Sequence, residues 1–248
     1  MKAIALLLSL LLTIPALAGS RRFTYVYEVT TSPPGDVEIE NWVTWKTQRP
    51  DDHGFSQVEF RHELEFGITE KFQAAVYLAD WNYHRGTSAG ERGFTLTGSA
   101  LELIYNFTNP VADPIGLAAY QEFQAGYRRF ESESRFLAQK NFGKFVVAYN
   151  ATLEAEWEGE GLEEREGEFQ QSLGLSYEIS PRLLFGAEFV HEVAFPDWSQ
   201  AEPGKFFAGP NISIRHRSYW MTLTALGQIT RAGDEPDFQV RTIFGFSF

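Results

Sequence analysis

The sequence predicts an all-β protein, a twelve-stranded antiparallel up-and-down transmembrane β-barrel. Three observations predict it. Apolar and polar residues alternate in segment after segment beyond residue 36, as they do in strands with one face toward lipid and one toward a wet interior. These segments are roughly 10 to 14 residues long, which is enough for a tilted strand to cross a bilayer. Aromatic residues make up 15% of the chain and recur near both ends of the segments.

The chain begins with the features of a secretory signal peptide. Lys2 precedes an apolar run from Ala3 to Leu12, and Ala16-Leu17-Ala18 is a cleavage sequence, so residues 1–18 are predicted to be removed. Residues 19–36 are predicted to be a periplasmic or lumenal segment, and residues 37–248 the barrel. Residues 22–30 alternate aromatic and polar side chains, and a thirteenth strand there would break the even strand count that a bacterial barrel requires.

The predicted strands follow one another with turn residues between them. Short connections are assigned to the periplasm, and longer ones to the outer side; the connection between the fifth and sixth strands is predicted to span residues 129–133. In order, the strands are Val37–Lys46, Ser56–Ile68, Phe72–Tyr83, Phe94–Phe107, Ile115–Arg128, Ser134–Phe142, Phe145–Trp157, Gly167–Ile179, Leu183–Val193, Lys205–Arg215, Tyr219–Thr230 and Asp237–Phe248.

The last strand has an aromatic face and a polar face, with Ile243 as the exception on the polar side. Its C-terminal Phe248 resembles the end of bacterial outer-membrane barrels, which the barrel-assembly machinery reads. The first and last strands must meet when the barrel closes. We therefore expect Arg241 to point inward and to offset Glu38 or Glu40 on the first strand.

Composition excludes several functions. The formal net charge is −12, and the signal peptide contains a base and no acid, so the mature chain is more acidic still. This charge argues against nucleic-acid binding. The chain has no Cys, so disulfides, thiolate metal sites and Cys catalysis are excluded. Its five His show no metal-ligand spacing, and no metal site or cofactor is predicted.

Function must reside in the inward-facing residues or in the loops, because the outward face meets lipid. Charges on membrane strands are costly unless they face water or a partner. The predicted inward-facing charges are mostly carboxylates. They predict passive passage of small polar or cationic solutes through an acidic lumen, and inward aromatic residues such as Tyr77 and Trp220 would narrow that lumen. The alternative is a non-conducting structural or adhesion barrel that acts through its loops. The predicted pore-lining residues are Glu38, Glu40, Glu59, Arg61, Glu63, Glu65, Glu102, Glu122, Arg128, Glu154, Glu188 and Arg241.

Two further hypotheses concern single sites. A lipid hydrolase needs a nucleophile, a base and a third group that orients the base. His216 and Ser218 lie at a predicted periplasmic turn without a third group nearby, so no enzyme is predicted. Asn41, His62 and Thr242 are polar at lipid-facing positions of strands that become neighbours, which indicates either a homodimer contact or local pairing.

The chain also resembles a family. A Glu- and Trp-rich first strand, Val37–Trp45, and the hairpin sequence Glu63–Thr69 are similar to a broad group of uncharacterised Gram-negative outer-membrane barrels. Some members of that group are labelled transporter-like or MetA-pathway phenol-degradation barrels. Asp113–Leu117, Gln139–Phe142 and Gly209–Asn211 extend the resemblance over most of the mature chain. It implies an outer-membrane barrel in contact with outer-membrane lipid, and it transfers no catalytic or binding residue.

Overall fold

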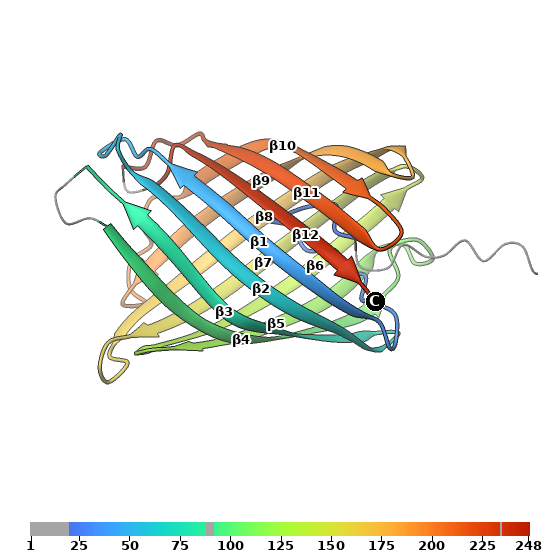
Figure 1. The fold of residues 1–248 in the computed structure, drawn as a ribbon, viewed down its shortest axis with the longest axis horizontal. Helices are drawn as coiled ribbons and strands as arrows, with labels where there is room; N and C mark the ends of the chain where they lie inside the picture. The colour runs from blue at the N-terminus through green and yellow to red at the C-terminus, as the bar shows by residue number, and fades with distance from the viewer. Residues whose placement is uncertain (1–19, 88–91, 234) are drawn as a thin grey trace, which may run out of the picture.

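The computed structural model describes residues 20–87, 92–233 and 235–248, so the predicted signal peptide lies outside the described residues. The described chain forms one closed barrel of twelve antiparallel strands, in which every strand pairs with its sequence neighbours and β1 pairs with β12 (Figure 1). The predicted fold class is confirmed. No helix in the described ranges is long and apolar enough to cross a membrane. The strands are β1 (Val37–Thr47), β2 (Ser56–Thr69), β3 (Phe72–Arg85), β4 (Arg92–Thr108), β5 (Gly116–Gly126), β6 (Arg129–Phe142), β7 (Phe145–Glu158), β8 (Glu164–Ser180), β9 (Leu183–Pro196), β10 (Lys205–Arg215), β11 (Tyr219–Gln228) and β12 (Phe238–Ser247).

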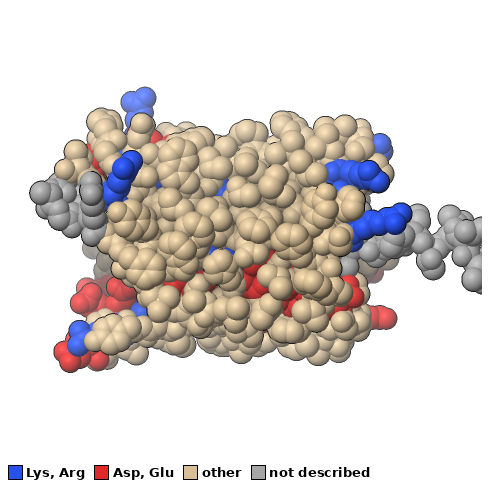
Figure 2. All heavy atoms as spheres, viewed as in Figure 1, with Lys and Arg blue, Asp and Glu red and all other residues tan. Residues whose placement is uncertain are grey.

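Most of the outer surface between the two ends is uncharged. In the face shown in Figure 2, Lys and Arg gather mainly at the two ends of the barrel, a band of Asp and Glu atoms crosses the lower middle, and other residues cover most of the surface between the ends. Large apolar side chains that would be buried in a soluble protein, such as Leu78, Leu96 and Leu153, are more than half exposed. Closure removes every sheet edge and satisfies the backbone within the wall, which a strand protein needs in order to cross lipid.

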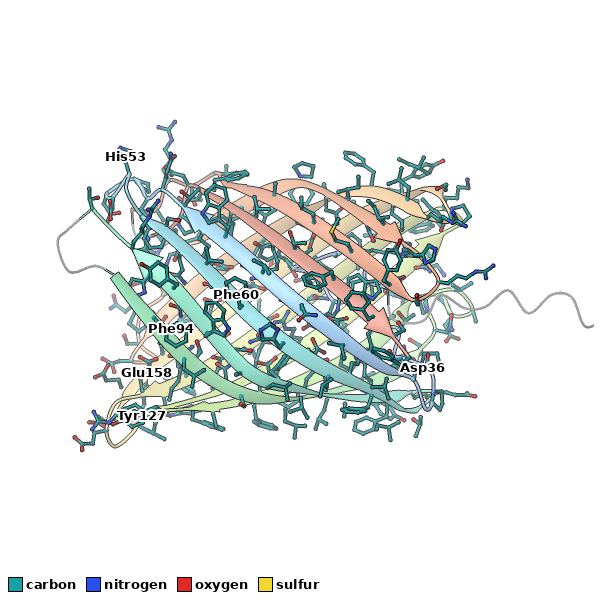
Figure 3. All side chains as sticks on the ribbon, in the orientation of Figure 1. Asp36, His53, Phe60, Phe94, Tyr127 and Glu158 are labelled. Carbon is teal, nitrogen blue, oxygen red and sulfur yellow. The ribbon has the colours of Figure 1, made fainter. Side chains whose placement is uncertain are left out.

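The two ends of the barrel differ. Asp36 lies at the end where β12 finishes, and His53, Tyr127 and Glu158 lie at the opposite end (Figure 3). The Phe248 backbone N–H donates to the carbonyl of Val37 at 2.9 Å, so the seam is closed up to the last residue. The end that carries the chain terminus and the shorter turns is called the periplasmic end below, and the other is the outer end.

The predicted loop after the fifth strand is wrong. β5 ends at Gly126 and β6 begins at Arg129, so only Tyr127 and Arg128 connect them. Arg128 adopts a φ of +56°, which is the left-handed conformation that a tight hairpin turn requires. Residues 129–133 therefore belong to a strand, and Glu131 and Glu133 are buried in the barrel interior.

A bulge in β3 changes which residues point inward. The pairing of β3 shifts on both sides between Tyr77 and Trp81. In a regular strand every second residue points inward, so Tyr77 and Asp80 would point to opposite faces. Both are nevertheless buried in the lumen, because the bulge adds a residue between them. The bulge thus brings a carboxylate into the lumen that simple alternation assigns to the lipid face.

Candidate functional site

The N-terminal segment, residues 20–36, lies inside the barrel. Its start runs within the outline of the strands in Figure 1, and its apolar side chains, including Phe23, Val26 and Val29, are buried against the wall. The segment forms no strand, so it is not a thirteenth member of the barrel. It enters from the periplasmic end, where Gly35 N–H donates to the carbonyl of Gly67 at 2.9 Å.

Side chains of the wall satisfy the backbone of this segment. The Glu188 carboxylate accepts hydrogen bonds from the N–H groups of Thr24 at 2.9 Å, Tyr25 at 2.7 Å and Val26 at 3.0 Å. Asn150 accepts from the Tyr27 N–H at 2.7 Å and donates to the Tyr27 carbonyl at 3.0 Å. Buried backbone groups need such partners, because the N–H and C=O groups of the barrel strands already bond to their neighbouring strands.

Amide side chains hold the rest of the segment. Gln139 accepts from the Val29 N–H at 3.0 Å, and Gln73 accepts from the Ser32 N–H at 2.9 Å. Asn106 donates to the carbonyl of Val29. The plug, as residues 20–36 are called below, is therefore fixed along its length to strands on several sides of the barrel.

Arg21 anchors the start of the plug to acidic residues. Its Nε lies 2.9 Å from the Glu40 carboxylate, and its Nη2 lies 3.6 Å from Glu63 and 3.8 Å from Glu65. The guanidinium also lies over the ring of Trp42, 4.9 Å from its centre. Burial alone would lower the pKa of Arg21, but the carboxylate of Glu40 and the groups around it raise this pKa well above its usual value, so the side chain stays charged.

Above the plug, a polar cavity of about 560 Å³ occupies the outer half of the lumen. Its floor includes Tyr25, Tyr27 and Trp42. Burial raises the pKa of the Tyr25 phenol, which keeps its proton and donates to Gln239 at 3.0 Å. We call this cavity the vestibule. Its charged lining consists of Glu59, Asp80, Glu122, Glu131, Glu133, Glu154, Glu158, Glu192 and Glu235, and of Lys46, Arg61, Arg129, Arg135 and Arg241.

Ion pairs order much of the vestibule lining. Arg61, a predicted lining residue, lies 2.7 Å from Asp80 and 3.4 Å from Glu122. Asp80, which the β3 bulge brings into the lumen, therefore fixes the position of Arg61. Arg129 binds Glu131 at 3.0 Å and Glu156 at 2.8 Å. Acids still outnumber bases in the lining, so its formal charge is negative.

A line of glutamates follows the wall from one end of the barrel to the other. Each of these glutamates is the direct cross-strand partner of the next, apart from one place on β3 where Ala75 stands between Glu65 and Glu102. Because the strands are tilted, the line rises from the periplasmic end of β1 toward the outer end of β8. We call it the glutamate row, and it consists of Glu38, Glu65, Glu102, Glu122, Glu133, Glu154 and Glu168.

The predicted lining residues fall into three groups. Glu59, Arg61, Glu122, Glu154 and Arg241 line the vestibule. Arg128 lies in the outer turn, where it pairs with Glu160 at 3.1 Å, so its assignment to the inward face of a strand is wrong. The remaining predicted residues are buried around the plug, and they are Glu38, Glu40, Glu63, Glu65, Glu102 and Glu188.

The expected pairing of Arg241 with Glu38 or Glu40 is also wrong. The register places Arg241 opposite Thr44, to which its Nε donates at 2.9 Å, and its guanidinium covers the ring of Tyr25 at 4.0 Å. Glu40 pairs with Arg21 instead, and Glu38 accepts from the Trp220 indole at 2.7 Å. The inward bases that sequence reasoning missed are Lys46 on β1 and those of the plug and of β6.

Two other predicted sites have simple local surroundings. The His62 Nδ1 lies 2.9 Å from the Asn41 Oδ1 on the lipid-facing side, so these two polar groups satisfy each other. His216 lies in the periplasmic turn between β10 and β11, with its ring stacked on Tyr219 at 4.6 Å.

Comparison with known proteins agrees with this architecture. Residues 15–242 match the family described as "Family of unknown function (DUF6662)". The chain belongs to this family. No curated protein matches the chain. The predicted resemblance to an outer-membrane barrel family is supported, but the finer resemblance to MetA-pathway phenol-degradation barrels is not.

Solved structures share the fold at low sequence identity. The COG4313 outer membrane channel from Pseudomonas putida F1 is 13% identical with a TM-score of 0.66, over 91% of this chain and 100% of that chain. The beta domain of the Bordetella autotransporter BrkA is 12% identical with a TM-score of 0.58, over 87% and 100%. A KdgM porin in complex with disordered oligogalacturonate is 8% identical with a TM-score of 0.54, over 86% and 99%. Together with the apolar outer surface, this fold makes the protein an outer-membrane β-barrel.

Proposed function

We propose that the protein is an outer-membrane channel for small cationic solutes, and that the plug restricts its lumen. The observation that carries this proposal is the glutamate row, which provides carboxylates at successive cross-strand positions from the periplasmic end to the vestibule. Like charges directly opposite each other destabilise a sheet, so a barrel with only a structural role gains nothing from this arrangement. Lines and rings of carboxylates favour cations in a pore.

The vestibule supports the same class of solute. Its acids outnumber its bases, and its floor is aromatic, with Tyr25, Tyr27 and Trp42 facing a cavity of about 560 Å³. A negative field in a low-dielectric wall concentrates cations. Aromatic faces add attraction for an organic cation that has lost part of its water shell.

The plug must limit the flow. It occupies the lumen below the vestibule, and its backbone is bonded to the wall through groups such as Glu188 and Asn150. These bonds are all non-covalent, and the chain contains no Cys. We infer that conduction requires displacement of the plug, with the row of carboxylates guiding the cation alongside it.

Recording from single channels in planar bilayers tests the proposal. Wild type is expected to open infrequently and to prefer cations. A double variant with Val26→Cys on the plug and Val146→Cys on β7, whose side chains share one buried cluster, is expected to close on oxidation and to reopen on reduction. Each single-Cys variant is the matched control. Conductance that oxidation leaves unchanged would show that the plug does not move.

Selectivity is tested separately from gating. Glu154→Gln combined with Glu168→Gln removes two adjacent carboxylates of the row at its outer end, and it is expected to lower the cation-to-anion permeability ratio. An unchanged ratio in open channels would contradict the role of the row.

A second candidate function rests on the same plug. A lumen filled by residues 20–36 also suits a non-conducting barrel that acts through its outer loops, such as residues 48–55 and 197–204. Silence in bilayers, both in wild type and after the plug is loosened by Glu188→Ala, would favour this structural or adhesion function over the channel.

A further inference from the structure

At the periplasmic half of the lumen, three carboxylates converge. Oxygen atoms of Glu63, Glu65 and Glu102 all lie within 4.8 Å of one another. The three residues are 1%, 5% and 0% exposed. Glu65 and Glu102 lie in the same cross-strand line on either side of Ala75. Glu63 is the next inward residue along β2.

Several oxygens of this cluster have no hydrogen-bond partner. Both carboxylate oxygens of Glu63 are buried and unpartnered, and so is Oε1 of Glu102. The other oxygen of Glu102 accepts from the hydroxyls of Tyr77 and Tyr27, and Glu65 accepts from Ser32. A buried charged oxygen without a partner is costly, and the cost is removed either by protons on these carboxylates or by a cation between them.

The plug does not supply enough positive charge. Arg21 is bonded to Glu40, and its Nη2 reaches only 3.6 Å from Glu63 and 3.8 Å from Glu65, beyond hydrogen-bond distance. Three carboxylates thus share one guanidinium. The acidic cluster in the vestibule differs, because there Glu131 binds Arg129 at 3.0 Å and Glu133 binds Arg135.

We propose that Glu63, Glu65 and Glu102 bind a calcium ion inside the barrel. An all-carboxylate set selects a hard divalent cation, and Ca²⁺ accepts oxygens at about 2.3–2.6 Å in flexible geometry. Oxygens on opposite sides of such an ion are roughly 5 Å apart, so a cluster of this size needs little rearrangement. Ser32 and Tyr27 of the plug bind two of the same carboxylates, so the ion joins the plug to the wall.

Calorimetric titration of the refolded full-length mature protein with CaCl2 tests the site. The protein is first treated with a chelator, in a non-ionic detergent that has no phosphate to bind calcium. Wild type is expected to bind one ion per chain and to unfold at a higher urea concentration when Ca²⁺ is present. Glu63→Gln and Glu102→Gln are each expected to weaken binding by at least ~10-fold, a loss typical of damage to a metal site. Glu192→Gln, the same change at an inward acid of the vestibule, is the matched control and should bind as wild type does.

A third variant covers the case in which the glutamine variants do not refold. Arg21→Ala removes the guanidinium that competes for Glu63 and Glu65, so it should bind Ca²⁺ more tightly than wild type. Absence of binding by wild type would overturn the proposal. So would equal binding by wild type and all three variants, since the ion would then sit elsewhere. None of these outcomes depends on whether the barrel conducts.

Discussion

Glu188 offers the sharpest test of how the plug is held. Its carboxylate is fully buried and accepts three backbone N–H groups from consecutive plug residues, Thr24, Tyr25 and Val26. It also accepts from Thr224 on β11. Glu188→Ala removes every one of these bonds and leaves the strand ladder of β9 intact, since that ladder uses only backbone atoms.

The structure sets the size of the expected effect. Hydrogen bonds to a charged group contribute about 1.5–3 kcal/mol each. We take the low end for each of the three backbone donors and allow for water that enters the space. The free energy of docking of the plug is then expected to fall by about 4 kcal/mol. A loss of this size lowers the ratio of docked to undocked plug on the order of 10³-fold.

Amide hydrogen exchange read by mass spectrometry measures that ratio directly. In wild type the amides of Thr24, Tyr25 and Val26 are expected to exchange slowly, and in Glu188→Ala they should exchange several hundred times faster or more. Glu192→Ala is the matched control, because Glu192 points inward from the same strand but binds Gln170 at 3.0 Å rather than the plug. Equal exchange at these amides in the two variants would refute the assignment of Glu188 as the main anchor.

Three further predictions concern the start of the plug, the lipid face and the C-terminus. In the presence of a chelator, Arg21→Ala should lower the free energy of unfolding in urea by about 3–5 kcal/mol, because it leaves the buried Glu40 carboxylate without its partner. Arg22→Ala should have a smaller effect, because the partner of Arg22 is Glu28, which lies within the plug itself. If a homodimer forms along β1 and β2, Asn41→Cys should give a disulfide-linked dimer in intact membranes. A wholly monomeric product would contradict the dimer and would mean that Asn41 and His62 are polar because they pair with each other. If the barrel-assembly machinery reads Phe248, its deletion should reduce folded barrel in cells but not refolding in detergent, and an equal loss in both would instead assign Phe248 to seam stability.

The wall of the barrel could be predicted from the sequence because its chemistry is periodic. One face of each strand meets lipid and the other meets the lumen, so side-chain alternation alone places residues such as Glu63 and Glu188 inside. The errors lie where the period breaks. The bulge in β3 puts Asp80 inside, and the two-residue turn at Tyr127 and Arg128 turns a predicted loop into strand.

The site itself could not be predicted to the same extent. Alternation assigns a face but not a register, so it predicts Glu38 or Glu40 as the partner of Arg241, which lies opposite Thr44. The glutamate row depends on the register of seven consecutive strand pairs, and no local pattern reports it. The plug was harder still, because its partners are spread over the whole barrel, and some of them, such as Glu188 for Tyr25, are more than a hundred residues away in the chain.

The plug nevertheless leaves a chemical signature on the wall. A closed barrel uses all its backbone groups in its own ladder, so any segment inside it must bind side chains. Asn and Gln can donate and accept, as a neighbouring strand would. Asn150 does both toward the plug, Gln73 and Gln139 accept from its N–H groups, and Asn106 donates to one of its carbonyls. Carboxylates can only accept, so those that meet no N–H group remain available to cations. Around the plug, the inward polar residues thus include amides that fix its backbone and glutamates such as Glu63 that meet no N–H group, with Glu188 as the carboxylate that accepts from consecutive plug N–H groups.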